Sequence, residues 1–192
     1  MQTERQKEIT EVALELISEK GIQGLTIKNL AKKIGITEPA IYRHFNSKID
    51  ILIAVLDLFK QNTEELFEKE FNNDRKSIDK IEHLFTRHFA TFSATPALVS
   101  VIFSEEIFRS EPVLIEKISE VMGKNDKIFT AIINNGQKTG EIRTDIEANH
   151  LSTLILGALR LFVKKWQLST FSFDLSEEGK HLIDSIKLLI SK

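Results

Sequence analysis

The sequence contains no cysteine, and among its 192 residues it has only 3 prolines and 8 glycines. Without cysteine the chain can form neither a disulfide framework nor a thiolate metal site. Because proline and glycine interrupt helices, their scarcity favours long helical segments. The chain also lacks any run that approaches about eighteen consecutive apolar residues, the length of a membrane-spanning helix. We therefore expect a protein without a membrane segment.

The first eight residues are polar and lack the apolar core of a secretory signal. Absence of cysteine is also consistent with a reducing compartment, so we expect a cytoplasmic protein. Hydrophobic residues make up 42% and charged residues 28% of the sequence, an ordinary balance for a globular chain that can bury a core.

Apolar residues recur at helical spacing along almost the whole chain, and no long alternating, strand-like run is present. This pattern predicts an all-α fold of about nine helices. The expected ranges are 4–20, 27–34, a short third helix after Thr37, 48–71, 77–94, 97–109, 113–138, 146–168 and 176–191. Gly123 lies inside one of these ranges, where it could kink or break the helix.

Two short helices near the N-terminus are joined by a very tight turn. Gly35 ends the first of them, and Thr37 caps the second. Pro39 occupies the first turn of the second helix, where a missing amide hydrogen costs little. Ile41 and Phe45 would face inward. Such a pair of helices is a candidate helix-turn-helix, which places its second helix in the major groove of DNA.

The charge is unevenly distributed along the chain, although the net charge is only -2. Residues 26–48 carry a net charge of +4, and residues 51–192 hold 18 basic against 21 acidic side chains. The charged residues of the basic segment are Lys28, Lys32, Lys33, Arg43 and Lys48 against Glu38. A basic patch on an acidic body confines phosphate attraction to one surface, as a site-specific DNA binder requires.

Residues 21–48 closely resemble the DNA-binding domain of the TetR family of regulators. The resemblance rests on the Thr-Ile pair at 26–27, the Ala-x-x-Ile-Gly-Ile turn at 31–36, the Ile-Tyr-x-His-Phe segment at 41–45 and the following Lys48. It implies a helix-turn-helix DNA-binding domain over 1–47, with the fourth helix as a link. It also implies a helical regulatory domain over 48–192 that binds a ligand and forms the dimer.

The resemblance, together with the chemistry of helix starts, divides the motif into two groups of DNA contacts. Helix starts present free amide hydrogens to phosphates, which predicts backbone contacts at Thr26 and Thr37. Base reading falls to the outward side chains of the third helix, and Arg43 is the candidate for a bidentate guanine contact. The phosphate group also includes Lys28, Tyr42 and Lys48, and the base-reading segment contains Glu38, Pro39, Ala40 and His44.

Three of these assignments have a structural alternative. Glu38 could serve as a favourable charge at a helix N-terminus rather than accept from a cytosine amino group. The Tyr42 ring could support the first helix. Lys28, like Lys32 and Lys33, could belong to an ordinary solvated face.

The middle helices are rich in phenylalanine. The family resemblance implies that they surround a cavity, and a phenylalanine lining would suit an apolar or aromatic effector. The candidate lining residues are Phe89, Phe92, Phe103 and Phe129. The alternative is that these rings are core. Arg87, His88 and Arg109 could orient a ligand, or they could form surface salt bridges.

The last two helices are more apolar than one buried stripe requires, which predicts a homodimer interface. The predicted interface residues are Leu151, Ile155, Leu159, Phe162, Trp166, Leu182, Ile186 and Ile190. A two-fold dimer would place two recognition helices about one DNA turn, or a small multiple of it, apart on a near-palindromic operator. Packing within one subunit is the alternative.

An enzyme is not supported by any motif in the sequence. There is no phosphate-binding glycine loop, no Gly-x-Ser-x-Gly elbow and no histidine pair at metal spacing, so we expect no catalytic residue, metal or cofactor. The family resemblance implies a repressor that a small-molecule effector releases from double-stranded operator DNA. A helical interaction protein without sequence-specific DNA binding, and an activator of the same fold, remain as alternatives.

Overall fold

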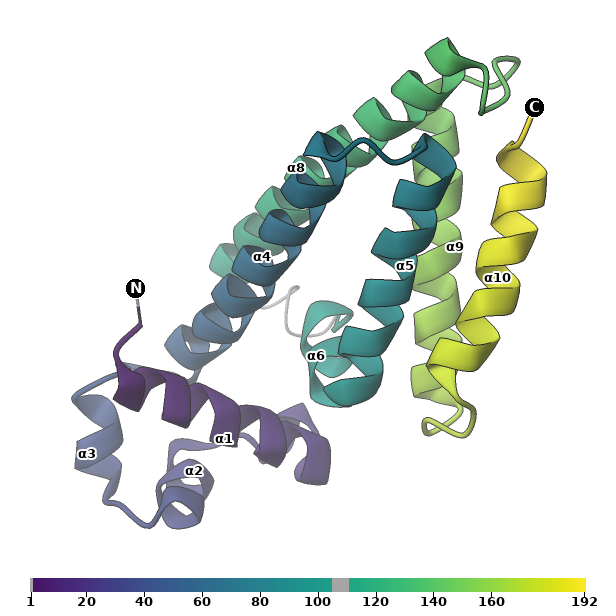
Figure 1. The fold of residues 1–192 in the computed structure, drawn as a ribbon. Coiled ribbons are helices and arrows are strands. Elements are labelled where there is room, and N and C mark those ends of the chain that lie inside the picture. Colours follow the sequence, from purple (N-terminus) through teal and green to yellow (C-terminus); the bar gives the residue numbers. More distant parts are fainter. Residues whose placement is uncertain (1, 105–110) are drawn as a thin grey trace. The chain divides into compact units, whose positions relative to one another are not determined.

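The computed structural model describes residues 2–104 and 111–192, and its helices are labelled in Figure 1. Within these residues the chain forms nine α-helices, one short 3-10 helix and an isolated β-bridge between Ile142 and Ser191. The elements are α1 (Glu4–Lys20), η1 (Ile22–Gly24), α2 (Ile27–Ile34), α3 (Glu38–Tyr42), α4 (Lys48–Asn72), α5 (Ser77–Ala94), α6 (Pro96–Ile102), α8 (Pro112–Thr139), α9 (Ala148–Leu168) and α10 (Leu175–Ile190). The all-α prediction is confirmed. In the described ranges no helix is long and apolar enough to cross a membrane.

Two helix boundaries differ from the sequence prediction by more than one residue. The helix predicted over 97–109 ends at Ile102, because the amides of Phe103 and Ser104 bond back to Val99 and Val101 and close the last turn. The rest of that prediction, 105–109, lies outside the described residues. The helix predicted from 146 begins at Ala148, because Gln137 Nε2 donates to the carbonyls of Arg143 and Ile146 and holds the preceding loop.

Helix α8 passes through Gly123 without interruption. A glycine inside a helix costs only about 1 kcal/mol relative to alanine. That cost is too small to break a helix of 28 residues that buries an apolar face.

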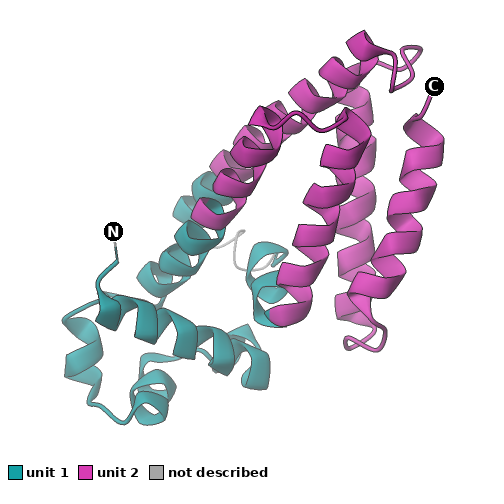
Figure 2. Ribbon diagram, in the orientation of Figure 1, with its two compact units in different colours: residues 1–60, 95–118 teal, residues 61–94, 119–192 magenta. Residues whose placement is uncertain are grey.

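The chain divides into two compact units, which Figure 2 colours separately. One comprises the described residues of 1–60 and 95–118, and the other comprises 61–94 and 119–192. Helices α4 and α8 contribute to both. These units are defined by compact packing, whereas the boundary expected between residues 47 and 48 separates a DNA-binding from a regulatory domain. That functional boundary stays a prediction.

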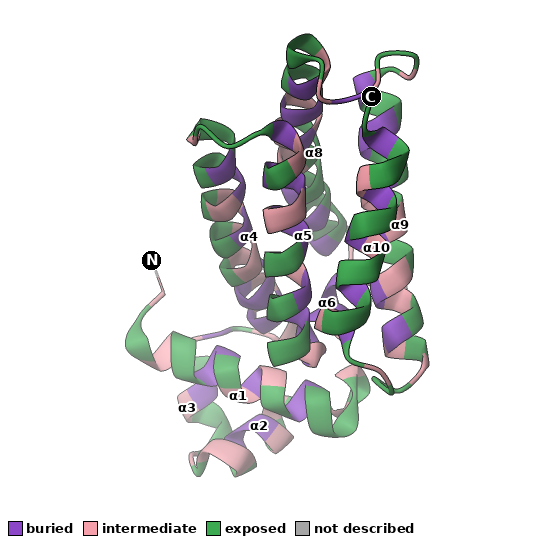
Figure 3. Cartoon of the chain, turned by 45° about the vertical axis from the view of Figure 1, so that its right-hand side comes forward, coloured by how far each residue is buried: buried purple, intermediate pink, exposed green. Residues whose placement is uncertain are grey.

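The first unit is built around the buried face of α1, which packs on η1, α2 and α6. Figure 3 shows that purple buried positions alternate with exposed ones along these short helices. The core side chains of this unit include Ile9, Ala13, Leu16, Leu30, Ile41, Phe45, Ile51 and Val55. Ile41 and Phe45 face inward as predicted, with 0% and 6% of their surface exposed.

The second unit has an aromatic core on α5 and its neighbours. Phe85 and Phe89 meet edge to face with centroids 6.0 Å apart, and Phe129 packs on Phe85 at 6.2 Å. Helix α10 packs along α5, and Gly179 makes this approach possible. A Cβ at Gly179 would lie 2.4 Å from the Phe89 ring, so any larger residue would collide with it.

Candidate nucleic-acid interface

A three-residue turn connects α2 to α3. Gly35 adopts a left-handed conformation with φ of 79°, and its amide and that of Ile36 both bond to the Ala31 carbonyl at 3.0 Å. A left-handed residue at this position is favourable for glycine and strained for residues with a Cβ. The short connection makes α2 and α3 a helix-turn-helix pair, as the sequence predicts.

The two threonines that precede α2 and α3 differ in their hydrogen bonding. Thr26 Oγ1 accepts from the Asn29 amide at 3.1 Å, which satisfies one free donor of α2 and leaves the Thr26 hydroxyl hydrogen for another acceptor. Thr37 is the N-cap of α3 by position but makes no capping bond with its side chain. Both residues are exposed, so each hydroxyl can donate to a phosphate. The phosphate contacts themselves stay predictions.

The predicted base readers lie on helix α3 and in the turn that follows it. Glu38, Pro39 and Arg43 are exposed, and Ala40 and His44 are partly exposed. The α-helix ends at Tyr42, but the amides of His44 and Phe45 still bond to the Ile41 carbonyl and continue the turn. Arg43 and His44 therefore project from a defined turn and not from a free loop.

The exposure of Tyr42 and the helix position of Glu38 bear on whether each residue contacts DNA or has a structural role. Tyr42 has 50% of its surface exposed, so its phenol can reach a phosphate while part of the ring stays packed. Glu38 is the acidic residue in the first turn of α3, where a negative charge is favourable. That position suits the structural role that the sequence left open for Glu38.

The lysines of α2 are not equivalent. Lys33 bonds to Glu15 and Glu19 of α1, and its hydrogen bond to Glu19 raises the pKa of Lys33. This pairing ties α2 to α1 and favours a structural role for Lys33. Lys28 is exposed, and the described part of the chain places no acidic group in an ion pair with it. Lys28 therefore keeps its predicted role as a phosphate contact.

Lys48 is positioned differently from a free surface lysine. Its Nζ donates to the Ile22 carbonyl at 2.9 Å, and burial lowers the pKa of Lys48. The ammonium thus anchors η1 to the start of α4 while two of its hydrogens remain for other acceptors. The sequence does not reveal this anchor, because the partners are separated by 26 residues and one of them is a backbone group. Phosphate binding by Lys48 stays a prediction.

The four phenylalanines predicted to line an effector pocket are divided between the two units. Phe89, Phe92 and Phe129 are at most 1% exposed in the second unit. Phe103 is partly exposed and belongs to the first unit. The three buried rings are core side chains in this structure, and their role toward an effector stays a prediction.

His88 lies among these rings. Its Nδ1 is 2.9 Å from the Leu84 carbonyl, and its ring meets Phe67 and Phe92 edge to face. Burial lowers the pKa of His88, so the neutral ring is favoured. Arg87 is exposed, and Arg109 lies outside the described residues.

Most of the residues predicted for the dimer interface are buried inside the chain. Those with at most 8% of their surface exposed are Leu151, Ile155, Leu159, Trp166, Ile186 and Ile190, while Phe162 and Leu182 are partly exposed. The buried six have little surface left for a partner, because they form the inner faces of α9 and α10. The exposed apolar side chains on these helices are Leu154, Leu161, Leu168, Leu188 and Leu189.

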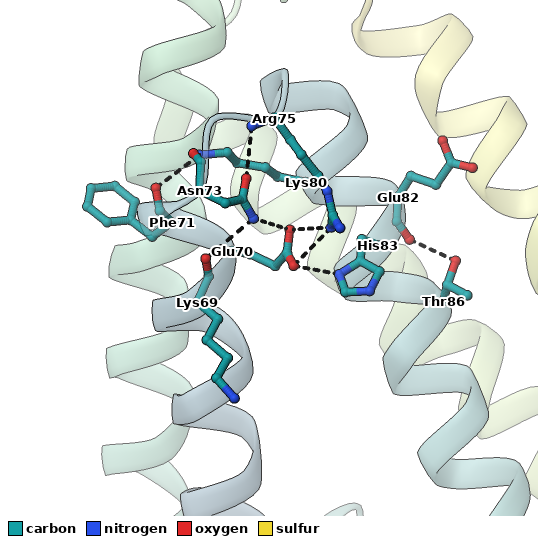
Figure 4. A network of polar contacts seen from close by, with 9 residues as sticks. All are labelled: Lys69, Glu70, Phe71, Asn73, Arg75, Lys80, Glu82, His83 and Thr86. Carbon is teal, nitrogen blue, oxygen red and sulfur yellow. Dashed lines mark hydrogen bonds and ion pairs between the residues drawn. The ribbon is translucent and has the colours of Figure 1, made fainter.

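A polar cluster in the second unit holds the corner between α4 and α5 (Figure 4). The buried carboxylate of Glu70 accepts from Arg75 Nη1 at 3.1 Å and from Asn73 Nδ2 at 2.8 Å, and His83 Nδ1 lies 2.6 Å away. Lys80 Nζ donates to the carbonyl of Asn73 at 2.6 Å and to that of Phe71. The charges compensate one another within the corner, and the lysine satisfies carbonyls at the end of α4.

An all-helical chain whose helix-turn-helix exposes basic residues such as Lys28 and Arg43 is typical of a DNA-binding transcriptional regulator. Residues 9–55 match the sequence model of bacterial regulatory proteins of the TetR family, and residues 59–191 match that of the C-terminal region of YsiA-like proteins in the same family. The chain belongs to the TetR family. A helical interaction protein without sequence-specific DNA binding is accordingly not favoured.

Three relatives illustrate the similarity. The fatty acid metabolism regulator protein of Bacillus subtilis is 26% identical over 171 residues, which cover 88% of this chain and 86% of that protein. The probable acrEF/envCD operon repressor of Escherichia coli is 22% identical over 94% of this chain and 84% of its own length. The crystal structure of FadR from Bacillus subtilis in complex with stearoyl-CoA has the same fold, with a TM-score of 0.77, 23% identity and coverage of 94% and 96%.

Proposed function

We propose that this regulator is a repressor that occupies its operator as a homodimer and is released by a long-chain fatty acyl thioester of coenzyme A. The observation that supports operator binding is the exposure of the residues that flank α3, with Thr37 before the helix and Arg43 and the partly exposed His44 after it. These side chains can donate hydrogen bonds to guanine edges and to phosphate oxygens.

Two observations favour an acyl effector. The second unit concentrates buried aromatic rings, and an apolar interior of this kind suits a hydrocarbon chain. The relatives add a chemical class, because one is named a fatty acid metabolism regulator and the FadR structure contains stearoyl-CoA. This agrees with the apolar effector expected from the sequence and specifies it further.

The exposed leucines of α9 support the dimer. Leu154, Leu161 and Leu168 are spaced by seven residues, so they share one stripe of the helix, with 62%, 57% and 73% of their surface exposed. Gly157 and Ala158 between them are small enough for another helix to approach closely. Leu188 and Leu189 extend the exposed apolar surface onto α10. Burial of these side chains would stabilise a two-fold pair.

The effector proposal is tested by DNA release. The wild-type protein is bound to the promoter DNA beside its own gene, and stearoyl-CoA, free stearate, coenzyme A or triclosan is added in a gel shift. We expect release by stearoyl-CoA alone. Release by free stearate would show that the effector is a simple fatty acid and not its thioester. Release by triclosan alone would show that the effector is aromatic and not an acyl chain. Failure to shift the DNA at all would contradict operator occupancy.

The direction of regulation needs a transcription assay on the same promoter. Repression predicts that the protein lowers transcript yield and that the effector restores it. A yield that rises with the protein would identify an activator instead.

The dimer is tested by Leu161→Glu, which places a charge in the middle of the apolar stripe. We expect sedimentation to show a monomer for this variant and a dimer for the wild type. Glu178→Gln is the control, because it changes charge at an exposed site on α10 away from the leucines in sequence. A Leu161→Glu variant that remains dimeric would contradict the proposed face.

A further inference from the structure

The side-chain amide of Gln6 makes two different contacts from α1. Its Oε1 accepts from the Thr3 backbone amide at 2.9 Å, and the backbone amide of Gln6 donates in return to Thr3 Oγ1 at 3.2 Å. These two bonds form the capping box that starts α1. The second contact comes from the side-chain nitrogen. Gln6 Nε2 donates in the opposite direction, to the His44 carbonyl at 3.2 Å and across 38 residues of sequence.

The His44 carbonyl lies beyond the end of α3. The helix ends at Tyr42, so carbonyls at this end have no helical amide that returns to them. Gln6 supplies the missing donor at a partly buried position. The backbone amides of His44 and Phe45 both donate to the Ile41 carbonyl. The turn that carries Arg43 and His44 is thus held both by the Ile41 carbonyl and by the Gln6 side chain.

We propose that Gln6 is a positioning residue for operator selection, which acts by holding the His44 carbonyl and thereby the orientation of Arg43 and His44. A bidentate contact with a base edge requires its side chain to be held in place, whereas attraction to phosphates tolerates displacement. Loss of the Gln6 bond should therefore reduce discrimination between DNA sequences more than affinity for DNA in general. This inference rests on the proposed operator binding.

The two functions of the Gln6 amide can be separated by substitution. In Gln6→Glu the carboxylate still accepts from the Thr3 amide and carries a favourable charge in the first turn of α1, but it has no hydrogen to donate to His44. Gln6→Met has a similar length and no charge, and it loses both contacts. Thr3→Ala is the matched control, because it removes the threonine hydroxyl from the capping box and leaves the Gln6 donor in place.

The experiment measures the ratio of affinities for two duplexes. One is selected by the wild-type protein from random DNA, and the other is a scrambled duplex of the same composition. We expect this ratio to fall about fivefold to tenfold in Gln6→Glu and Gln6→Met, the effect of one lost hydrogen bond. Thr3→Ala should lower the melting temperature and leave the ratio within about twofold of wild type, a change that is small against the lost bond.

The outcomes distinguish this inference from the proposed function. A wild-type ratio near one would overturn operator binding, and the role of Gln6 with it. A wild-type preference that Gln6→Glu retains in full would overturn the role of Gln6 alone. An equal loss of the ratio in Thr3→Ala would assign the effect to the stability of α1 and would likewise overturn it.

Discussion

The first unit of this regulator and its second unit use side chains in opposite ways. In the first unit, short helices present Arg43, Lys28 and Thr37 outward, and single hydrogen bonds from Gln6 and Lys48 hold the connecting segments. In the second unit, long helices turn their aromatic rings toward one another and bury them. Substitutions of the outward residues of the first unit should therefore change DNA binding, and substitutions of the buried rings of the second should change stability.

The largest expected effect is on stability, from Phe129→Ala in the second unit. Phe129 has 0% of its surface exposed, and removal of a buried phenylalanine costs about 3 to 5 kcal/mol through lost transfer energy and the cavity it leaves. Urea denaturation measures this change, and Met122→Ala, at an exposed position of the same helix, is the control. A loss below about 1 kcal/mol, well under the range for a buried ring, would show that the aromatic interior is not tightly packed.

Arg43→Ala should have the next largest effect, on operator binding. We expect a loss of about 1 to 3 kcal/mol and a relaxed preference at one base position. The unfolding free energy should change by less than about 0.5 kcal/mol, because Arg43 is exposed. Fluorescence anisotropy on the selected and scrambled duplexes gives both affinities. Equal weakening on the two duplexes would remove Arg43 from the base readers.

Alanine substitutions of Lys28, Lys33 and Lys48 should distinguish lysines that bind phosphate from lysines that hold the fold together. Lys28→Ala should reduce the slope of log affinity against log salt by about one, since one phosphate contact is lost. Lys48→Ala should reduce the slope similarly and also cost about 1 kcal/mol of stability through its bond to Ile22. Lys33→Ala should leave the slope unchanged, because Lys33 pairs with α1. An unchanged slope in Lys48→Ala would make it an anchor only.

The smallest expected effect is the pH dependence that His88 gives to the second unit. Burial lowers the pKa of His88 in the folded chain, so the unfolded chain binds the proton more tightly. Stability should therefore be lost as the pH falls below the ordinary histidine pKa. In His88→Leu, denaturation curves between pH 7 and pH 5 should show a smaller loss than in the wild type. A larger loss in the variant would mean that His88 is charged in the folded state.

The comparison between units also explains which predictions succeeded. The helix-turn-helix could be identified from Gly35, Thr37 and Pro39, because caps and turns depend on residue types at fixed local spacing. The contacts of Gln6, Lys33 and Lys48 could not, because each joins segments that are at least 14 residues apart and two of them end on a carbonyl. Nothing in a local pattern distinguishes a lysine that binds phosphate from one that binds the backbone.

The last two helices show where sequence patterns become ambiguous. Both α9 and α10 carry leucines on more than one side, so periodicity identifies the helices but not the side that meets the core. The predicted interface residues Leu151 and Ile155 face inward, whereas Leu154 and Leu161 are exposed. An apolar side chain contributes similar free energy whether it is buried in its own chain or against a partner, so only its surroundings distinguish the two.

By itself, the sequence determined the helical composition and the turn between α2 and α3. These follow from local physics: helical periodicity, capping and the conformational freedom of glycine. The tertiary structure alone decided that Gln6 and Lys48 hold the motif in place and which leucines of α9 remain exposed. Those features depend on groups distant in sequence that meet only after folding, and no local pattern encodes such a meeting.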